Sequence, residues 1–455
     1  MSVNKYSKHL AILSAAILMT LSHSAFAETV SMNLPQAMER AFGTNPAISI
    51  ADYELQSAKA SYDAARQNHY LTVTGSHSSG RGGYNYNLYD STGLYSKHIN
   101  NTHTNALTAS VPIYTGGQLK GATMRAKANY KSALVGKQAA YNDMRSTVTN
   151  GYFTVLQRDN LQKLGQESVD RLADHLKNVQ AQYDVGVVAK VDVLRSEVEL
   201  NDAEQSLTQA QNAYELAVSQ MDKIVGLPLD TKLQLENILV YNPYDHDLPY
   251  CLQYASDHRP ELEQAKQKVK AAEGSLVAAR SGYQPQVTGH ATQNLGKNDN
   301  WPGDGRNNWS VGVSVSMNIF DSGVTYSKIH GAKADLEAAK EEYRDTVDSL
   351  NLEVRSNYLN MREAEKRIKT TEVAVEQAEE DYRIAQLRYA NGVGTNTDVM
   401  DASVALTQAK DNYLQALYDY NTSKTDLETS MGVPMLNPVQ VIAPVKGEKA
   451  EAKAE

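Results

Sequence analysis

The chain has 455 residues, with 53 acidic against 44 basic side chains and 41% hydrophobic residues. Its net charge of -9 at pH 7 argues against a nucleic-acid partner, because such a partner requires a basic face. The single cysteine excludes an intrachain disulfide framework and any cysteine-rich zinc or iron-sulfur site. This composition is typical of a folded, water-exposed protein and excludes a multi-span helical membrane protein.

The first residues have the pattern of a secretory signal peptide. Lys5 and Lys8 precede an apolar run, and Ala25-Phe26-Ala27 supplies the small residues typical of a cleavage site. The run of about 12 apolar residues is shorter than the roughly 20 that a membrane-spanning helix needs. We therefore expect residues 1–27 to direct export of the chain.

The rest of the chain contains an internal duplication. A shift of 214 residues places Pro46 on Pro260, whereas a shift of 206 residues places Asp192 on Asp398. The two shifts differ by 8 residues, so the length difference falls between residues 75 and 111, in a segment rich in Gly, Asn, Tyr and Ser. We expect this segment, including the glycine-rich residues 80–83, to be an external loop.

Alternating side chains predict two strands in each repeat. In the clearest pair, Leu107, Val111 and Ile113 alternate with polar or small residues, and residues 311–319 follow the same pattern. The first strand of each repeat alternates more weakly. We expect strands near residues 70–78, 106–115, 285–294 and 309–320.

Two long proline-free stretches predict long helices. No proline lies between Pro112 and Pro228 or between Pro302 and Pro434, and apolar residues in both stretches recur at steps of three and four. We expect helical hairpins at residues 118–226 and 324–431, and a helix before the first strand of each repeat at residues 35–68 and 259–282. A helix from residue 118 to 184 would be about 100 Å long.

These elements predict a mainly α-helical fold with a transmembrane β contribution. The expected order is a signal peptide (1–27), a first repeat (28–226), a linker (227–256), a second repeat (257–436) and a disordered charged tail (437–455). Strands with one apolar face are the units of outer-membrane barrels, but four strands cannot close, because open edges in lipid leave backbone groups unpaired. Two copies would give eight strands and a filled interior, whereas three would give twelve and a water-filled lumen.

The repeats also share short motifs at one offset. These are Tyr183-Asp-Val-Gly-Val and the corresponding residues 389–402, Val-Pro-Ile-Tyr-Thr-Gly-Gly at 111–117 and its partner at 318–323, and Gly226-Leu-Pro and Gly432-Val-Pro. With this order of elements, the chain resembles the TolC-like outer-membrane efflux protein family over about residues 30–435. The resemblance implies a homotrimer with a twelve-stranded β-barrel in the lipid of the outer membrane, continuous with a long periplasmic α-helical barrel.

The resemblance also implies a passive exit duct of a tripartite efflux or type I secretion system. Its partners would be a periplasmic adaptor and an inner-membrane pump of the ABC, RND or MFS type. The alternatives are a periplasmic adaptor subunit, although adaptors have one hairpin and not two copies, and a structural coiled-coil protein of the envelope. The 11 histidines lack a metal-ligand pattern and no catalytic motif is present, so we expect no cofactor, no metal and no enzymatic activity.

The resemblance assigns site residues to the hairpin tips. Asp398 and Asp401 would form the acidic, cation-favouring rings of a periplasmic gate, and Tyr389 would bond Asp192. Gly394 stands where the family has an arginine. The alternative is that Asp398 and Asp192 only cap the helices that follow the tips.

The tips themselves are candidate adaptor contacts. The residues at the two turns are Gly186, Val187, Gly392 and Val393. The alternative is that the glycines serve only to make the turns.

Overall fold

The computed structural model describes residues 29–86, 96–298 and 306–433. The expected signal peptide and charged tail lie outside these residues. The described chain divides into two compact units, which we call the hairpin unit and the sheet unit. The hairpin unit comprises residues 29–46, 142–248 and 354–433, and the sheet unit comprises the described residues of 47–141 and 249–353.

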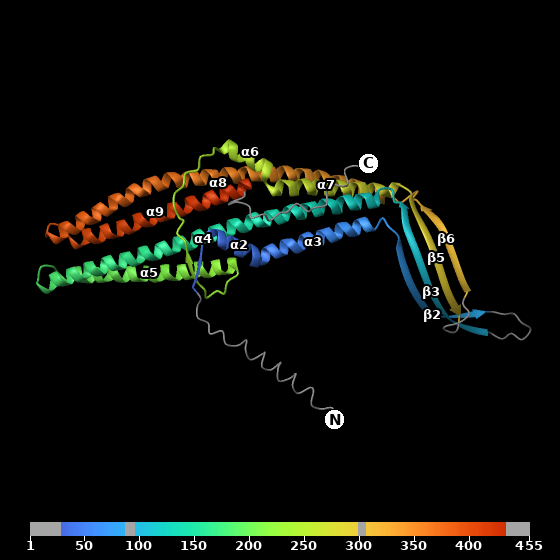
Figure 1. Ribbon diagram of the computed structural model, residues 1–455, viewed down its shortest axis with the longest axis horizontal. Coiled ribbons are helices and arrows are strands. Elements are labelled where there is room, and N and C mark those ends of the chain that lie inside the picture. The colour runs from blue at the N-terminus through green and yellow to red at the C-terminus, as the bar shows by residue number, and fades with distance from the viewer. Residues whose placement is uncertain (1–28, 87–95, 299–305, 434–455) are drawn as a thin grey trace, which may run out of the picture. The chain divides into compact units, whose positions relative to one another are not determined.

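The sheet unit contains one open antiparallel sheet, visible in Figure 1. Its strands, in spatial order, are β2 (Thr72–Tyr86), β3 (Ser96–Tyr114), β5 (Gln286–Asn298) and β6 (Arg306–Ser316). Its shorter helices are α3 (Pro46–Gln67), α6 (Leu248–His258) and α7 (Pro260–Arg280), followed by the 3-10 turn η1 (Ser281–Tyr283). One face of the sheet is apolar and uncovered in the single chain: Val311, Val313 and Val315 on β6 are 72%, 62% and 66% exposed.

The hairpin unit is built from matching helices. It contains α2 (Leu34–Thr44), α5 (Lys190–Val225), α9 (Asn396–Met431) and the parallel strand pair β1 (Thr29–Met32) and β4 (Lys232–Leu235). The long helices α4 (Gln118–Asp184) and α8 (Val324–Ala390) contribute to both units. The long helices have 67 residues each, and α5 and α9 have 36 each. The expected hairpins are therefore confirmed, with α4 ending at the predicted residue.

The helix expected at residues 35–68 is interrupted, so this prediction was wrong. Asn45 has extended backbone angles (φ -73°, ψ 128°) and separates α2 from α3, which begins at Pro46. Proline lacks an N–H to donate and disfavours helical angles in the residue before it. At its other end α2 begins with a capping box, in which Asn33 and Gln36 bond each other's backbone N–H groups.

Two predictions about the strands were also wrong. Residues 80–83 lie in β2, where Gly80 pairs with Thr102 and Gly83 with Ile99. Backbone hydrogen bonds continue this ladder without apolar side chains, so alternation did not reveal its length. β6 ends at Ser316, and the predicted residues 317–320 follow the strand. They lead into a turn with left-handed backbone at Ser322 and Gly323.

In the part of the chain that the structure describes, none of the helices has an apolar stretch long enough to cross a membrane.

Candidate functional site

The tip of each hairpin is a five-residue connection with the same backbone geometry. After α4, the Gly186 N–H donates to the Tyr183 carbonyl at 2.8 Å and the Val187 N–H to the Gln182 carbonyl at 2.9 Å. After α8, Gly392 and Val393 repeat this pattern with Tyr389 and Arg388. Both glycines have positive φ, at 77° and 74°, so the turn function proposed for them is met.

The valines at the tips are presented to the outside of the single chain. Val187 is 72% exposed and Val393 is 68% exposed. A turn requires only the glycines, and the exposed valines are accessible to a partner at each tip.

Asp398 caps α9, as the alternative interpretation expected. Its carboxylate accepts a hydrogen bond from the Thr395 N–H at 3.0 Å, and its own N–H donates to the Thr395 hydroxyl at 3.2 Å. These bonds hold the pKa of Asp398 below its ordinary value. The side chain remains exposed, as does Asp401 one turn later. The cap therefore does not exclude a role for either carboxylate in a charged ring.

The expected bond between Tyr389 and Asp192 is not made in this structure. The Tyr389 hydroxyl is buried and has no hydrogen-bond partner among the described residues. Burial, and after it the charge of Asp192, raises the pKa of Tyr389. The two side chains are thus close enough to interact electrostatically without a hydrogen bond.

A cluster of mostly polar side chains, with the buried His175, Ser196 and Asn396 at its centre, lies between the two hairpins near their tips. We call it the tip cluster, and its members are His175 on α4, Asp192 and Ser196 on α5, Tyr389 on α8, and Asn396 and Met400 on α9. The His175 Nε2–H donates to the Asn396 side-chain oxygen at 2.6 Å. The Asn396 amide donates to the Asp192 carbonyl at 3.1 Å and to the Ser196 hydroxyl at 3.2 Å. One asparagine therefore joins three helices.

No motif in the sequence points directly to the tip cluster. His175 lies between the buried residues Leu172 and Val179 on the apolar face of α4, and Asn396 directly follows the cap residue Thr395. The steps of three and four from Leu172 to Val179 place His175 in the helix seam. A polar residue in such a seam needs a partner, and this is the signal that was available.

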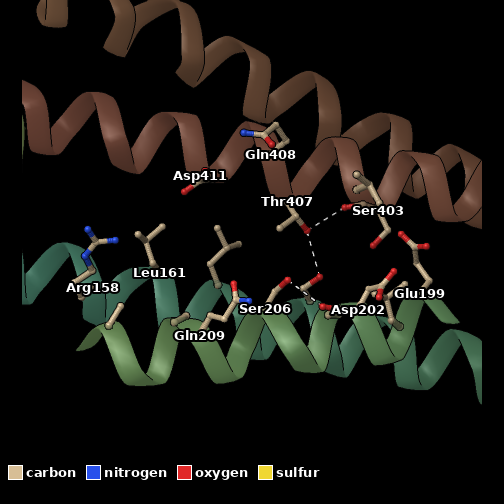
Figure 2. A pocket seen from close by; sticks show the side chains of 18 residues that line it. Arg158, Leu161, Glu199, Asp202, Ser206, Gln209, Ser403, Thr407, Gln408 and Asp411 are labelled. Atoms are coloured by element: carbon tan, nitrogen blue, oxygen red, sulfur yellow. Dashed lines mark hydrogen bonds between the residues drawn. The ribbon is translucent and has the colours of Figure 1, made fainter. Parts of the chain in front are cut away.

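A groove of about 620 Å³ runs between α4, α5 and α9 within the hairpin unit (Figure 2). Leu161, Leu164 and Leu172 of α4 give it an apolar wall, and Ser403 and Thr407 of α9 contribute hydroxyl groups to its lining. The Thr407 hydroxyl donates to the Ser403 carbonyl at 3.0 Å and accepts from Arg171 at 2.7 Å. The buried Ser403 hydroxyl has no partner among the described residues.

The charges along the groove are mostly negative. Glu199 and Asp202 lie on α5 and Asp411 on α9, with Arg158 on α4 as the basic residue of the lining (Figure 2). Burial raises the pKa of Asp411, and Arg158 opposes that rise. A partner bound here would meet an apolar wall beside an acidic rim. Among the described residues, no group of His, Cys, Asp and Glu side chains is arranged to hold a metal ion.

Comparison with known proteins gives the family. Residues 37–227 and 251–433 match the family described as outer membrane efflux protein. The chain is 23% identical over 418 residues to the probable efflux pump outer membrane protein TtgC of Pseudomonas putida, covering 88% of this chain and 82% of that protein. It is 24% identical over 368 residues to the outer membrane protein TolC of Escherichia coli, covering 74% and 71%.

The fold is also shared with a solved channel. The crystal structure of the Campylobacter jejuni CmeC outer membrane channel aligns with a TM-score of 0.77 at 18% identity, over 88% of this chain and 85% of that one.

Proposed function

Because this chain belongs to the outer membrane efflux protein family, we propose that three copies of it assemble into one outer-membrane exit duct. The protein is a channel and not an enzyme. It conducts material outward as the outer-membrane part of an efflux or secretion system. The number of copies, the partners and the gate residues are the proposed parts.

The open sheet is the observation that supports a trimer. Its outer strands β2 and β6 each have an edge without a strand partner among the described residues, and its apolar face is exposed. Three copies supply twelve strands, which close the edges and leave a water-filled lumen. The apolar face would then contact outer-membrane lipid, and export would use residues 1–27 as a signal peptide. In this assembly the two repeats, residues 28–226 and 257–436, would alternate around the ring, joined within each chain by a linker at 227–256.

We propose that the groove between α4, α5 and α9 receives a periplasmic adaptor. The groove supplies an apolar wall with an acidic rim, which suits an amphipathic helix that carries basic residues. The exposed Val187 and Val393 extend the contact to the tips. The adaptor would connect the duct to an inner-membrane pump, of the ABC, RND or MFS type.

Native mass spectrometry of the detergent-extracted protein from the outer-membrane fraction tests the assembly. Three chains, together with ion conductance in planar bilayers, are the expected result. A soluble monomer without conductance would overturn the duct and favour a structural coiled-coil protein.

Binding of adaptor to the wild type but not to Ala203→Arg, which places a cation in the groove, would support the docking site. Lys163→Ala, on an exposed side chain outside the groove lining, is the matched control.

A further inference from the structure

The tip cluster places an ionisable imidazole where it holds the two hairpins together. His175 is 6% exposed and Asn396 is 4% exposed, so their 2.6 Å hydrogen bond is shielded from water. Asn396 is the first residue of α9, and its amide also holds the first turn of α5 through the Asp192 carbonyl. The start of α9 is thus bound to both helices of the first hairpin through one side chain.

A positive charge at His175 would be poorly compensated in this site. From α8, the Tyr389 ring lies against the imidazole with 5.4 Å between ring centroids, and from α5, Asp192 is the acidic member of the cluster. Other charged or titratable groups on these helices near the tip include Arg171, Asp174, Lys177, Tyr183 and Asp184 on α4, Lys190, Arg195 and Glu197 on α5, Asp381, Tyr382, Arg383 and Arg388 on α8, and Asp398 and Asp401 on α9. The hydrogen bond found for the imidazole within the described residues is the one to Asn396.

We propose that the tip cluster is a proton-sensitive latch, in which protonation of His175 at acidic pH releases the start of α9 from α4 and α5 and favours an open tip. This regulation rests on the proposed duct. The latch needs a neutral imidazole, because a buried imidazolium loses its hydration without gaining an ion pair.

The direction of the pH effect follows from the burial. Burial lowers the pKa of His175, and the bond to Asn396 offsets part of that effect. In a released, hydrated tip the group returns toward its ordinary pKa of about 6.5. Protons therefore bind the released state more tightly. The latch is intact above about pH 6.5 and weakens as the pH falls below that value.

Bilayer conductance of the full-length protein at pH 7.5 and pH 5.5 tests the latch. We expect the open probability of the wild type to be higher at pH 5.5 than at pH 7.5, by up to about tenfold, because pH 5.5 lies about one unit below the ordinary imidazole pKa that the released state regains. His175→Gln keeps a donor for Asn396 but cannot titrate, so it should conduct equally at both values. His330→Gln, which removes an exposed histidine on α8, should respond like the wild type.

Hydrogen exchange of the unmodified protein gives a second measurement that does not depend on a variant. After correction for intrinsic rates, peptides covering 170–200 and 390–405 should exchange faster at pH 5.5 than at pH 7.5. Equal protection at both values, or an identical pH response in His175→Gln, would overturn the latch and leave the duct intact. Absence of conductance in the wild type at both values would instead overturn the duct itself.

Discussion

At the scale of single residues, Asp222 on α5 is an ionisable group in an unfavourable site. Its side chain is fully buried, and neither carboxylate oxygen has a hydrogen-bond partner among the described residues. Burial, and after it the charge of Asp230, raises the pKa of Asp222 to about 6. Because the folded pKa lies above the unfolded value, the protonated form stabilises the fold. That contribution is complete below the unfolded pKa of about 4 and is lost as the pH rises through about 6.

We therefore predict that Asp222→Asn raises the thermal unfolding temperature at pH 7.5 more than at pH 4.5. The ionised carboxylate costs at most about 3 kcal/mol at neutral pH, because the folded pKa of about 6 lies above the ordinary value of about 4. Glu215→Gln on an exposed position of the same helix should change neither value. A stability of Asp222→Asn that equals the wild type at both pH values would show that the carboxylate is solvated.

The two acidic residues of the proposed gate differ in their local bonding, and this separates their roles. Asp401→Asn should lower the preference for cations, measured as a reversal potential in a salt gradient, without changing stability. Asp398→Asn should lower cation preference as well, and should also weaken the hydrogen bond that the Thr395 N–H donates to this side chain, because the amide oxygen carries no charge. If cation preference is unchanged in the double variant, the acidic rings are not the selectivity element.

At the scale of elements, Tyr152 anchors the small β1–β4 pair to α4. Its hydroxyl donates to the Glu236 carbonyl at 2.8 Å, with the Met32 carbonyl at 3.3 Å, and the side chain is fully buried. Burial raises its pKa to about 12, so the hydroxyl remains a donor at all physiological pH values. We predict that Tyr152→Phe destabilises the hairpin unit by about 1–2 kcal/mol, because two buried carbonyls lose their donor.

Hydrogen exchange should locate this loss at residues 29–32 and 232–236. Tyr358 is the matched control, since it occupies the corresponding position in the second repeat but is half-buried, with its hydroxyl accepting from Arg362 at 3.2 Å. Tyr358→Phe should leave exchange in the strand pair unchanged. Equal effects of the two variants would contradict the anchoring role of Tyr152.

The sequence predicted the helices better than the strands for a physical reason. Proline-free stretches with apolar residues at steps of three and four define helices of fixed period, so α4 ended at Asp184 as expected. Strand length depends on backbone pairing, which continued through the polar residues 76–86 where no alternation marks it. The break at Asn45 is predictable from the sequence, because Pro46 disfavours helical angles in the residue before it.

The site was predicted in part, because local patterns do not report contacts between hairpins. The tip glycines and the cap at Asp398 follow from short-range rules and were anticipated. The bond between His175 and Asn396 joins residues 221 positions apart, and nothing local to either residue specifies the other. The resemblance supplied Tyr389 and Asp192 as partners, and the structure instead places Asn396 between the hairpins.

At the scale of the whole molecule, closure of the proposed ring makes a testable contact. If β6 of one chain pairs with β2 of the next, cysteines at Ser314 and Thr74 should form disulfides between chains, and a scan of neighbouring positions finds the register. We expect covalent dimers and trimers on a denaturing gel under oxidising conditions. Cysteines at Thr108 and Thr292, which are paired within one chain, should leave the mass at one chain. The native Cys251 is buried and does not compete.

The matched helix lengths have a further consequence for symmetry. Since α4 and α8 have 67 residues each and α5 and α9 have 36 each, the two hairpins of one chain are equally long. In a ring of three such chains, the six hairpin tips would form a rim with approximate sixfold symmetry, although the chain itself repeats only three times. A partner that contacts only the shared backbone of the tips would find six equivalent sites, while one that contacts a side chain present in one repeat only, such as Thr395, would find three.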